Sequence, residues 1–232
     1  MSTPATIIDI IIPAFNEEQA IGKVIDEIPK ENVRHIIVGN NNSSDRTAEV
    51  AKAHGAIALL EKRKGYGYAC LIGLDYIKSL ATAPDIVVFI DGDHSDYPEY
   101  LHDLVRPIIN DQADLVIGSR VLGIAEKGSM TIPQRFGNWL ATRMIRWIYR
   151  VRFTDLGPFR AIRYSSLLKI DMQDTTFGWT VEMQVKAAKL KMRCLEIPVN
   201  YRQRIGVSKV SGTIKGTILA GYKIIWTILK LI

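Results

Sequence analysis

The sequence predicts an α/β fold in which helices flank a mostly parallel β-sheet, and two observations carry this prediction. Short runs of β-branched residues alternate with helical patterns through the first hundred residues, which is typical of βαβ units. The run Ile86–Ile90 is apolar throughout, without the alternation of a half-exposed strand, as expected where helices cover both faces of a sheet. We therefore expect a single Rossmann-like sheet.

The predicted elements follow one another in a regular order. The strands are Ile7–Ile12, His35–Val38, Ile57–Leu60, Ile86–Ile90 and Leu115–Ile117, and the helices are Glu17–Ile28, Asp45–His54, Gly67–Leu80 and one that begins at Pro98. No linker-like run or internal repeat interrupts the chain. We expect one domain over residues 1–232, which is long enough to bury a substantial core.

Charge is distributed unevenly along the chain. Residues 1–100 carry 9 Lys and Arg against 15 Asp and Glu, whereas residues 101–232 carry 21 against 9, which together give the net charge of +6. The two halves should therefore contact different partners. A basic half attracts nucleic acid, anionic lipid or a phosphorylated substrate, and charge alone does not choose among them.

Composition also bears on the compartment. Cys70 and Cys194 lie far apart in apolar stretches, which predicts buried free thiols in a reducing compartment. The chain start lacks the features of a secretion signal. Lys215, Lys223 and Lys230 interrupt the most apolar region, so no run reaches the ~18 residues that span a bilayer. We expect a cytoplasmic protein.

Three polar loops follow predicted strands and should meet at one edge of the sheet. They are Pro13–Glu18, Asn40–Asp45 and Asp91–Asp93, and ligands of open α/β sheets bind beyond the carboxyl ends of the strands. The first two loops also fit plain helix capping, by Asn16 with Glu17 and Glu18, and by Ser44 or Asp45.

The acidic turn Asp91-Gly92-Asp93 offers two carboxylates to one space, with a glycine that permits close approach of a ligand. Mg²⁺ or Mn²⁺ takes one or two protein carboxylates plus substrate phosphate oxygens. The alternative is a solvated turn that caps the next helix. The position after a five-residue apolar strand favours the metal.

The order of these motifs resembles glycosyltransferase family 2, and most closely its dolichyl- or polyprenyl-phosphate sugar synthase branch. The motifs are Pro13–Glu18, the Asn-rich loop with Ser43 and Asp45, Lys64–Gly67, Asp91–Asp93, Gly118–Arg120, Thr154–Arg160, Gly178–Glu182 and Arg204–Lys209. The resemblance covers nearly the whole chain. It implies a GT-A fold, with a nucleotide-sugar-binding half at 1–120 and an acceptor-binding, membrane-facing half at 121–232.

Site residues follow from the resemblance. It implies that the nucleotide is bound by Pro13, Phe15, Glu17, Asn40, Asn41, Lys64, Gly65, Asp91 and Gly92, and the metal diphosphate by Asp91 and Asp93. It implies that the acceptor phosphate or the donor diphosphate is bound by Arg120, Arg135, Arg204, Ser208 and Lys209. Family members usually have an aspartate where this chain has Asn40 and Asn41, which leaves the base open between uracil and guanine. They often have a glutamine where this chain has Ser95, which argues against a third side-chain metal ligand.

The implied reaction is inverting transfer of a hexose from a nucleoside-diphosphate sugar, a UDP-sugar before GDP-mannose, to a lipid phosphate such as polyprenyl phosphate. An anionic acceptor needs positioning and charge neutralisation more than a general base, which suits Arg120 and Arg135. A hydroxyl acceptor needs a carboxylate base, for which Asp155 and Glu182 are the candidates. The structural alternative for Asp155 is an ion pair with Arg152 or Arg160.

Two segments have the pattern of amphipathic helices. Arg143, Arg146 and Arg150 recur at helical spacing among tryptophan and isoleucine, which fits either an anionic membrane surface or a solvated basic face. Near the C-terminus, apolar residues repeat at helical spacing with lysines on another face. This segment fits packing on the domain, and its hydrophobicity favours lipid. We expect a peripheral membrane protein without a nucleic-acid partner.

Other functions fit less well. Gly65-Tyr66-Gly67 imitates the start of a dinucleotide fingerprint but lacks the third glycine and does not follow the first strand. The P-loop string and the glycine-rich signature of sugar-phosphate nucleotidyltransferases are absent. A non-catalytic membrane-surface or nucleic-acid-binding module remains the rival outside enzymes, and it would bind its ligand without a divalent metal.

Overall fold

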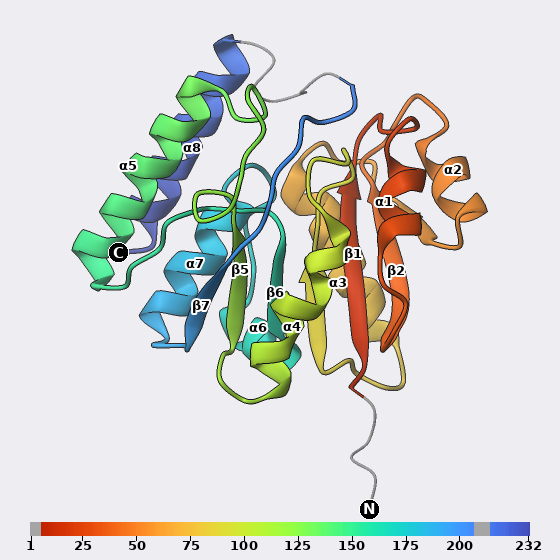
Figure 1. Ribbon diagram of the computed structural model, residues 1–232, viewed down its shortest axis with the longest axis horizontal. Coiled ribbons are helices and arrows are strands. Elements are labelled where there is room, and N and C mark those ends of the chain that lie inside the picture. Colours follow the sequence, from red (N-terminus) through yellow and green to blue (C-terminus); the bar gives the residue numbers. More distant parts are fainter. Residues whose placement is uncertain (1–5, 207–213) are drawn as a thin grey trace, which may run out of the picture.

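The computed structural model describes residues 6–206 and 214–232, and its elements alternate as the sequence predicts (Figure 1). The strands are β1 Ile8–Ala14, β2 Val33–Asn40, β3 Ile57–Leu60, β4 Ile86–Phe89, β5 Leu115–Ser119, β6 Arg160–Arg163 and β7 Cys194–Pro198. The helices are α1 Ile21–Glu27, α2 Thr47–Ala53, α3 Tyr66–Ser79, α4 Leu101–Ile109 after a 3₁₀ turn, α5 Ile132–Tyr149, α6 Tyr164–Ile170, α7 Trp179–Lys189 and α8 Ile214–Lys230.

The described residues form one seven-stranded sheet in the order β3-β2-β1-β4-β6-β5-β7. Strands β1 to β4 pair in parallel, as do β5 and β7, while β6 runs antiparallel to both of its neighbours. The predicted α/β fold with a mostly parallel sheet is confirmed. Because β1, β2 and β4 are parallel neighbours, the loops that follow them leave the same edge of the sheet.

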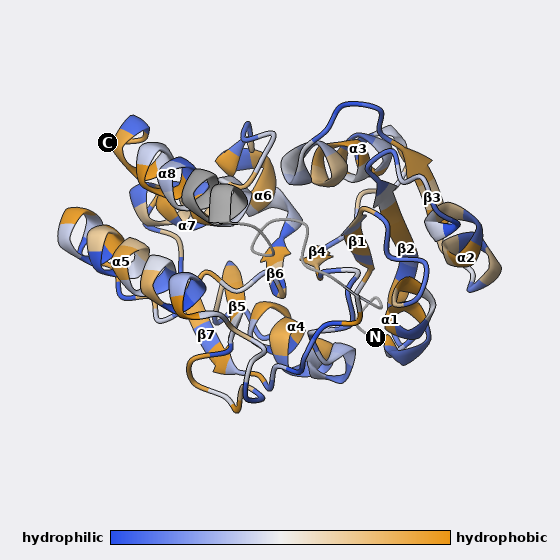
Figure 2. Ribbon diagram, turned by 90° about the horizontal axis from the view of Figure 1, so that it is seen from above, coloured by the Kyte–Doolittle hydropathy of each residue, from blue (hydrophilic) through white to orange (hydrophobic). Residues whose placement is uncertain are grey.

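Helices cover both faces of the sheet, which explains why its strands are apolar throughout (Figure 2). On one face, α1, α2 and α4 pack on side chains such as Ile10 and Val88. On the other face, α3 packs on Ile11 and α7 on Phe89, and α5, α6 and α8 contribute to the same core. Successive residues of one strand therefore belong to opposite cores.

The first helix begins later than the sequence predicts. It starts at Ile21 instead of Glu17, and Asn16 does not cap it. Asn16 has a φ of 54° and binds the neighbouring loop, since its backbone N–H donates to Ser43 Oγ and its Oδ1 accepts the Ser44 N–H. Asp45 does accept the N–H of Thr47, the first residue of α2. These side chains join two loops in preference to starting a helix.

The C-terminal helix packs on the domain through one side only. α8 lies beside α5 at one end of the molecule (Figure 1), with Ile228 fully buried in the core and Ile224 packed against it. Tyr222, Trp226 and Leu229 are exposed on the same helix. One side of α8 therefore packs on the domain, and the other contributes apolar side chains to the surface. No helix in the described part of the chain is long and apolar enough to cross a membrane.

Cys70 and Cys194 are free thiols, as predicted. Cys70 is buried, but Cys194 is only half-buried because it lies on β7 at the edge of the sheet.

Candidate active site

The acidic turn follows β4 and is held by short polar contacts. Asp91 Oδ1 accepts a hydrogen bond of 2.9 Å from the hydroxyl of Tyr66. Asp93 Oδ1 accepts the backbone N–H of Ser95 at 2.9 Å. Burial and the neighbouring Asp93 carboxylate raise the pKa of Asp91 to about 6. Two carboxylates that repel each other in a partly buried turn favour binding of a cation.

The predicted nucleotide residues come together around a cavity of about 300 Å³. Eight of the nine line it: Pro13, Phe15, Glu17, Asn41, Lys64, Gly65, Asp91 and Gly92. The ninth, Asn40, ends β2 and its Oδ1 accepts the Ser43 N–H. Asn41 links two loops, because its amide donates to Arg63 O and its Oδ1 accepts the Gly65 N–H. Asn41 thus holds the loop with Lys64 and Gly65 at the cavity wall, whereas Asn40 does not line the cavity.

A second cavity, of about 280 Å³, adjoins the first along the acidic turn. Both are lined by Tyr66, Asp91, Asp93, Phe177 and Arg204. The second is also lined by Arg120, Trp179, Thr180 and Tyr201, together with residues of α5 and α8. The acidic turn therefore lies where two binding spaces meet, which is the arrangement that group transfer between two substrates requires.

The wall at this junction depends on a close backbone approach. Tyr68 N donates to Thr175 O, and a Cβ on Gly67 would lie 2.0 Å from Asp174 O. Only glycine therefore fits at position 67. This contact holds the loop that carries Phe177 against the Lys64–Gly67 turn. Neither Tyr66 nor Phe177 was predicted as a site residue, although Tyr66 lies inside the motif Lys64–Gly67.

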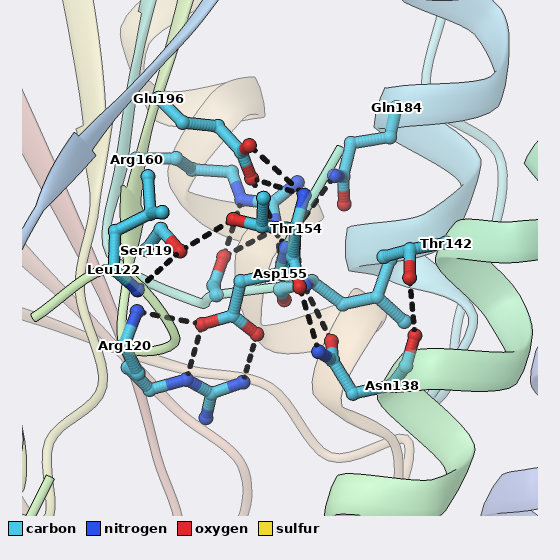
Figure 3. A network of polar contacts seen from close by, with 12 residues as sticks. Ser119, Arg120, Leu122, Asn138, Thr142, Thr154, Asp155, Arg160, Gln184 and Glu196 are labelled. Carbon is cyan, nitrogen blue, oxygen red and sulfur yellow. Dashed lines mark hydrogen bonds and ion pairs between the residues drawn. The ribbon is translucent and has the colours of Figure 1, made fainter. Parts of the chain in front are cut away.

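Asp155 is completely buried in an ion pair with Arg120, as Figure 3 shows. Both carboxylate oxygens accept from the guanidinium at 2.8 Å, and Oδ2 also accepts the Arg120 backbone N–H. Burial favours the neutral acid, but the charge and hydrogen bonds of Arg120 prevail and lower the pKa of Asp155. A carboxylate held this way is a poor proton acceptor, which favours the structural alternative of an ion pair over a base.

The predicted alternative partners of Asp155 are wrong. Arg160 is fully buried and donates to the backbone carbonyls of Leu156, Gly157 and Thr180, and Arg152 is exposed on a neighbouring groove. The loop around Asp155 is fixed from three elements (Figure 3): Glu196 of β7 accepts its N–H, Gln184 of α7 donates to its carbonyl, and Asn138 of α5 accepts the next N–H.

Glu182 contacts the backbone of a neighbouring loop and a lysine of its own helix. Its carboxylate accepts the backbone N–H groups of Gln173 and Asp174 and pairs with Lys186 at 2.7 Å. It lies in the first turn of α7 and lines neither cavity at the acidic turn. Its side chain orders the loop that leads to Phe177, which favours a structural role over that of a base.

The predicted phosphate-binding residues separate into three groups. Arg120 and Arg204 line the cavity beside the acidic turn. Arg135 lines a separate groove of about 670 Å³ with Arg143, Arg146 and Arg152, and Arg120 forms the border between the two spaces. Ser208 and Lys209 lie outside the described residues.

The donor set fits a hard divalent cation. In the part of the chain that the structure describes, no group of three or more His, Cys, Asp or Glu side chains could hold a metal ion. The acidic pair alone suits Mg²⁺ or Mn²⁺, which complete their shell with water and phosphate oxygens. Ser95 is committed to Asp93, so it is not a third ligand.

Comparison with known proteins decides the family. The model of glycosyl transferase family 2 matches residues 9–171. The chain belongs to this family. An uncharacterized glycosyltransferase of Mycobacterium tuberculosis is 34% identical to it over 92% of this chain and 94% of the relative. A dolichyl-phosphate hexose transferase of Haloferax volcanii is 33% identical over 87% and 85%. An undecaprenyl-phosphate mannosyltransferase of Micrococcus luteus is 29% identical over 89% and 88%.

Solved structures share the fold of this glycosyltransferase. Glucosyl-3-phosphoglycerate synthase from Mycobacterium tuberculosis, in complex with Mn²⁺, UDP-glucose and phosphoglyceric acid, superposes with a TM-score of 0.75 at 22% identity. The match covers 98% of this chain and 80% of that one. The expected GT-A fold is confirmed.

Proposed function

We propose that this glycosyltransferase moves a hexose, with inversion, from a nucleoside-diphosphate sugar to a lipid phosphate such as polyprenyl phosphate. Asp91 and Asp93 hold Mg²⁺ or Mn²⁺ on the diphosphate, where the cation neutralises the leaving group. The observation that carries the proposal is the meeting of two cavities at this acidic turn. A UDP-sugar is the preferred donor, which agrees with the UDP-glucose and Mn²⁺ bound by the structural neighbour.

The lining of the second cavity supports a phosphate acceptor. Among the described residues that line it, Asp91 and Asp93 are the only acids, and both belong to the metal site. A hydroxyl acceptor would need a further carboxylate to take its proton, whereas a phosphate monoester is already anionic. Arg120 supplies the positive charge that such an acceptor needs. The names of the two lipid-phosphate transferases among the relatives agree.

The hydroxyl acceptor remains the second candidate, because the structural neighbour is a glucosyl-3-phosphoglycerate synthase. Release of nucleoside diphosphate separates the two. The protein is incubated with Mn²⁺ or Mg²⁺ and a panel of UDP- and GDP-sugars, with and without polyprenyl phosphate. We expect release that depends on the lipid phosphate. If small phosphorylated alcohols support the release and lipid phosphate does not, the proposed acceptor is refuted.

The metal site has its own test. Asp91→Ala and Asp93→Ala should each abolish Mn²⁺-dependent binding of UDP in calorimetry, because each removes a ligand. Asp75→Ala is the matched control, since Asp75 is an exposed aspartate on α3 that pairs with Lys78. If both site variants bind UDP without metal as tightly as the wild type does with Mn²⁺, the assignment is wrong.

We also propose peripheral association with an anionic membrane through α5. Ile132, Phe136, Trp139 and Trp147 are exposed, the last at 86%. At about 100° per residue they fall with Arg135, Arg143 and Arg146 in an arc of about 120°. Cationic and aromatic side chains on one face suit a lipid interface. Trp147→Ser should reduce sedimentation with phosphatidylglycerol vesicles, and equal sedimentation would exclude this surface.

A further inference from the structure

Arg204 occupies the metal-binding side of the acidic turn. Its Nη1 lies 3.2 Å from Asp93 Oδ2 and its Nη2 lies 2.8 Å from Glu17 Oε1. Both carboxylates are nearly buried, while the arginine side chain is 27% exposed. A guanidinium between two carboxylates neutralises charge that would otherwise be costly to bury.

The contact falls on the oxygen that a cation would use. Asp93 Oδ1 accepts the Ser95 N–H and hydroxyl, so Oδ2 is the oxygen left for an outside partner, and Arg204 takes it. A metal ligand at Oδ2 and a guanidinium at Oδ2 compete for the same negative charge. Binding of a divalent cation therefore requires Arg204 to weaken this contact.

The backbone around Arg204 is tied to the turn, which limits any change to the side chain. Ile205 N donates to Asp93 O at 2.9 Å, and Arg202 N donates to Ser95 O at 3.0 Å. Arg204 also has a buried, unpaired donor, because its Nε has no hydrogen-bond partner among the described residues. A buried unpaired N–H costs free energy that a phosphate oxygen would recover.

We infer that Arg204 is the resident counter-ion of the acidic turn and exchanges partners when the metal diphosphate binds. In this exchange Arg204 leaves Asp93 Oδ2, stays anchored on Glu17 and turns its freed N–H groups to the diphosphate. Glu17 then anchors Arg204 instead of contacting the nucleoside. The inference rests on the proposed metal site and adds that Arg204 lowers the affinity of this site for free metal ions.

The test compares binding of Mn²⁺ alone with binding of UDP in the presence of Mn²⁺. Free Mn²⁺ is followed by electron paramagnetic resonance, and UDP binding by calorimetry. Arg204→Gln should tighten Mn²⁺ alone about tenfold, the effect of one neighbouring charge on a carboxylate, and weaken UDP with Mn²⁺. Arg204→Lys keeps the charge and should stay near the wild type for Mn²⁺ alone.

Arg46→Gln is the matched control, since Arg46 pairs with Glu18, the neighbour of Glu17, and is 82% exposed. It should change neither measurement. If Arg204→Gln leaves Mn²⁺ affinity unchanged or weakens it, while Asp93→Asn abolishes binding, the exchange is refuted and the metal site stands. If the wild type binds no Mn²⁺ at all, with or without UDP, the proposed metal site falls and this inference with it.

Discussion

Replacing Asp155 with asparagine would test whether the Arg120–Asp155 pair supports the site or takes part in proton transfer. The substitution keeps the shape of the side chain and removes its charge. The guanidinium of Arg120, whose side chain is 13% exposed, would then lose its only carboxylate partner in the described part of the chain.

The expected loss of stability follows from burial. Removing one partner of a buried ion pair costs about 3–5 kcal/mol, because the other charge stays in a poorly solvated place. Asparagine keeps one acceptor oxygen for Arg120, so we expect the lower end, about 3 kcal/mol. For Arg120→Gln combined with Asp155→Asn, the loss should be smaller than the sum of the two single losses by about 1–3 kcal/mol.

Urea denaturation at pH 7 measures these free energies of unfolding. The pH dependence gives a second check, with its sign set by the lowered pKa of Asp155. Near pH 4 the unfolded chain holds the Asp155 proton more tightly than the folded protein does, so stability rises with pH. The advantage of the wild type over Asp155→Asn should be complete above the unfolded pKa of about 4 and should shrink as the pH falls through the folded pKa.

Enzyme kinetics tests whether Asp155 acts as a base. Folded Asp155→Asn should keep Mn²⁺-dependent UDP binding, and its loss of turnover should appear in the KM for the acceptor, because a misplaced Arg120 binds the acceptor less well. A variant with wild-type stability, an unchanged acceptor KM and a kcat that no longer falls at acidic pH would refute the reasoning and restore Asp155 as a base.

Three further outcomes follow from single contacts. The pKa of Asp91 is raised to about 6, so the ionised carboxylate destabilises the fold above that pH. Asp91→Asn should therefore increase the free energy of unfolding at pH 7.5 by on the order of 1 kcal/mol. In urea titrations this gain should disappear near pH 4. Glu182→Gln should cost about 1–3 kcal/mol in thermal or urea unfolding through its two backbone donors, and folded protein should keep its kcat; loss of turnover without loss of stability would contradict the structural role. Gly67→Ala should cost at least about 1–3 kcal/mol, because its Cβ would lie 2.0 Å from Asp174 O, and should weaken UDP binding in calorimetry; a neutral variant would contradict this close approach.

Much of the part of the site that is predicted to bind the nucleotide sugar could be predicted from the sequence, because local sequence patterns determine it. The run Ile86–Ile90 is apolar enough to form a strand buried on both faces, and the acidic turn must follow it. Parallel neighbours then bring the loops after β1, β2 and β4 to one edge. Convergence of the predicted nucleotide residues on one cavity is a consequence of topology.

The acceptor side could not be predicted in the same way, because its contacts join residues far apart in sequence. Arg160 lies closer to Asp155 in the chain than Arg120 does, yet β6 turns Arg160 toward backbone carbonyls. Strand β5 instead delivers Arg120, 35 residues away, to the carboxylate. Phe177 reaches the junction only because Gly67 admits the loop before it. Tertiary packing decides each of these positions.

The two arginines beside the acidic turn differ in how firmly their side chains are held. Arg120 has two nitrogens bound to Asp155, which is completely buried, and its Nη1 has no hydrogen bond among the described residues. Arg204 has one nitrogen on Asp93 and one on Glu17, at a partly exposed position. A donor fixed before the substrate arrives stabilises developing charge without reorganisation, whereas a donor that must leave a carboxylate first couples its action to ligand binding. Arg120 therefore suits a permanent phosphate site, and Arg204 suits a site that forms only when the metal and the diphosphate arrive together.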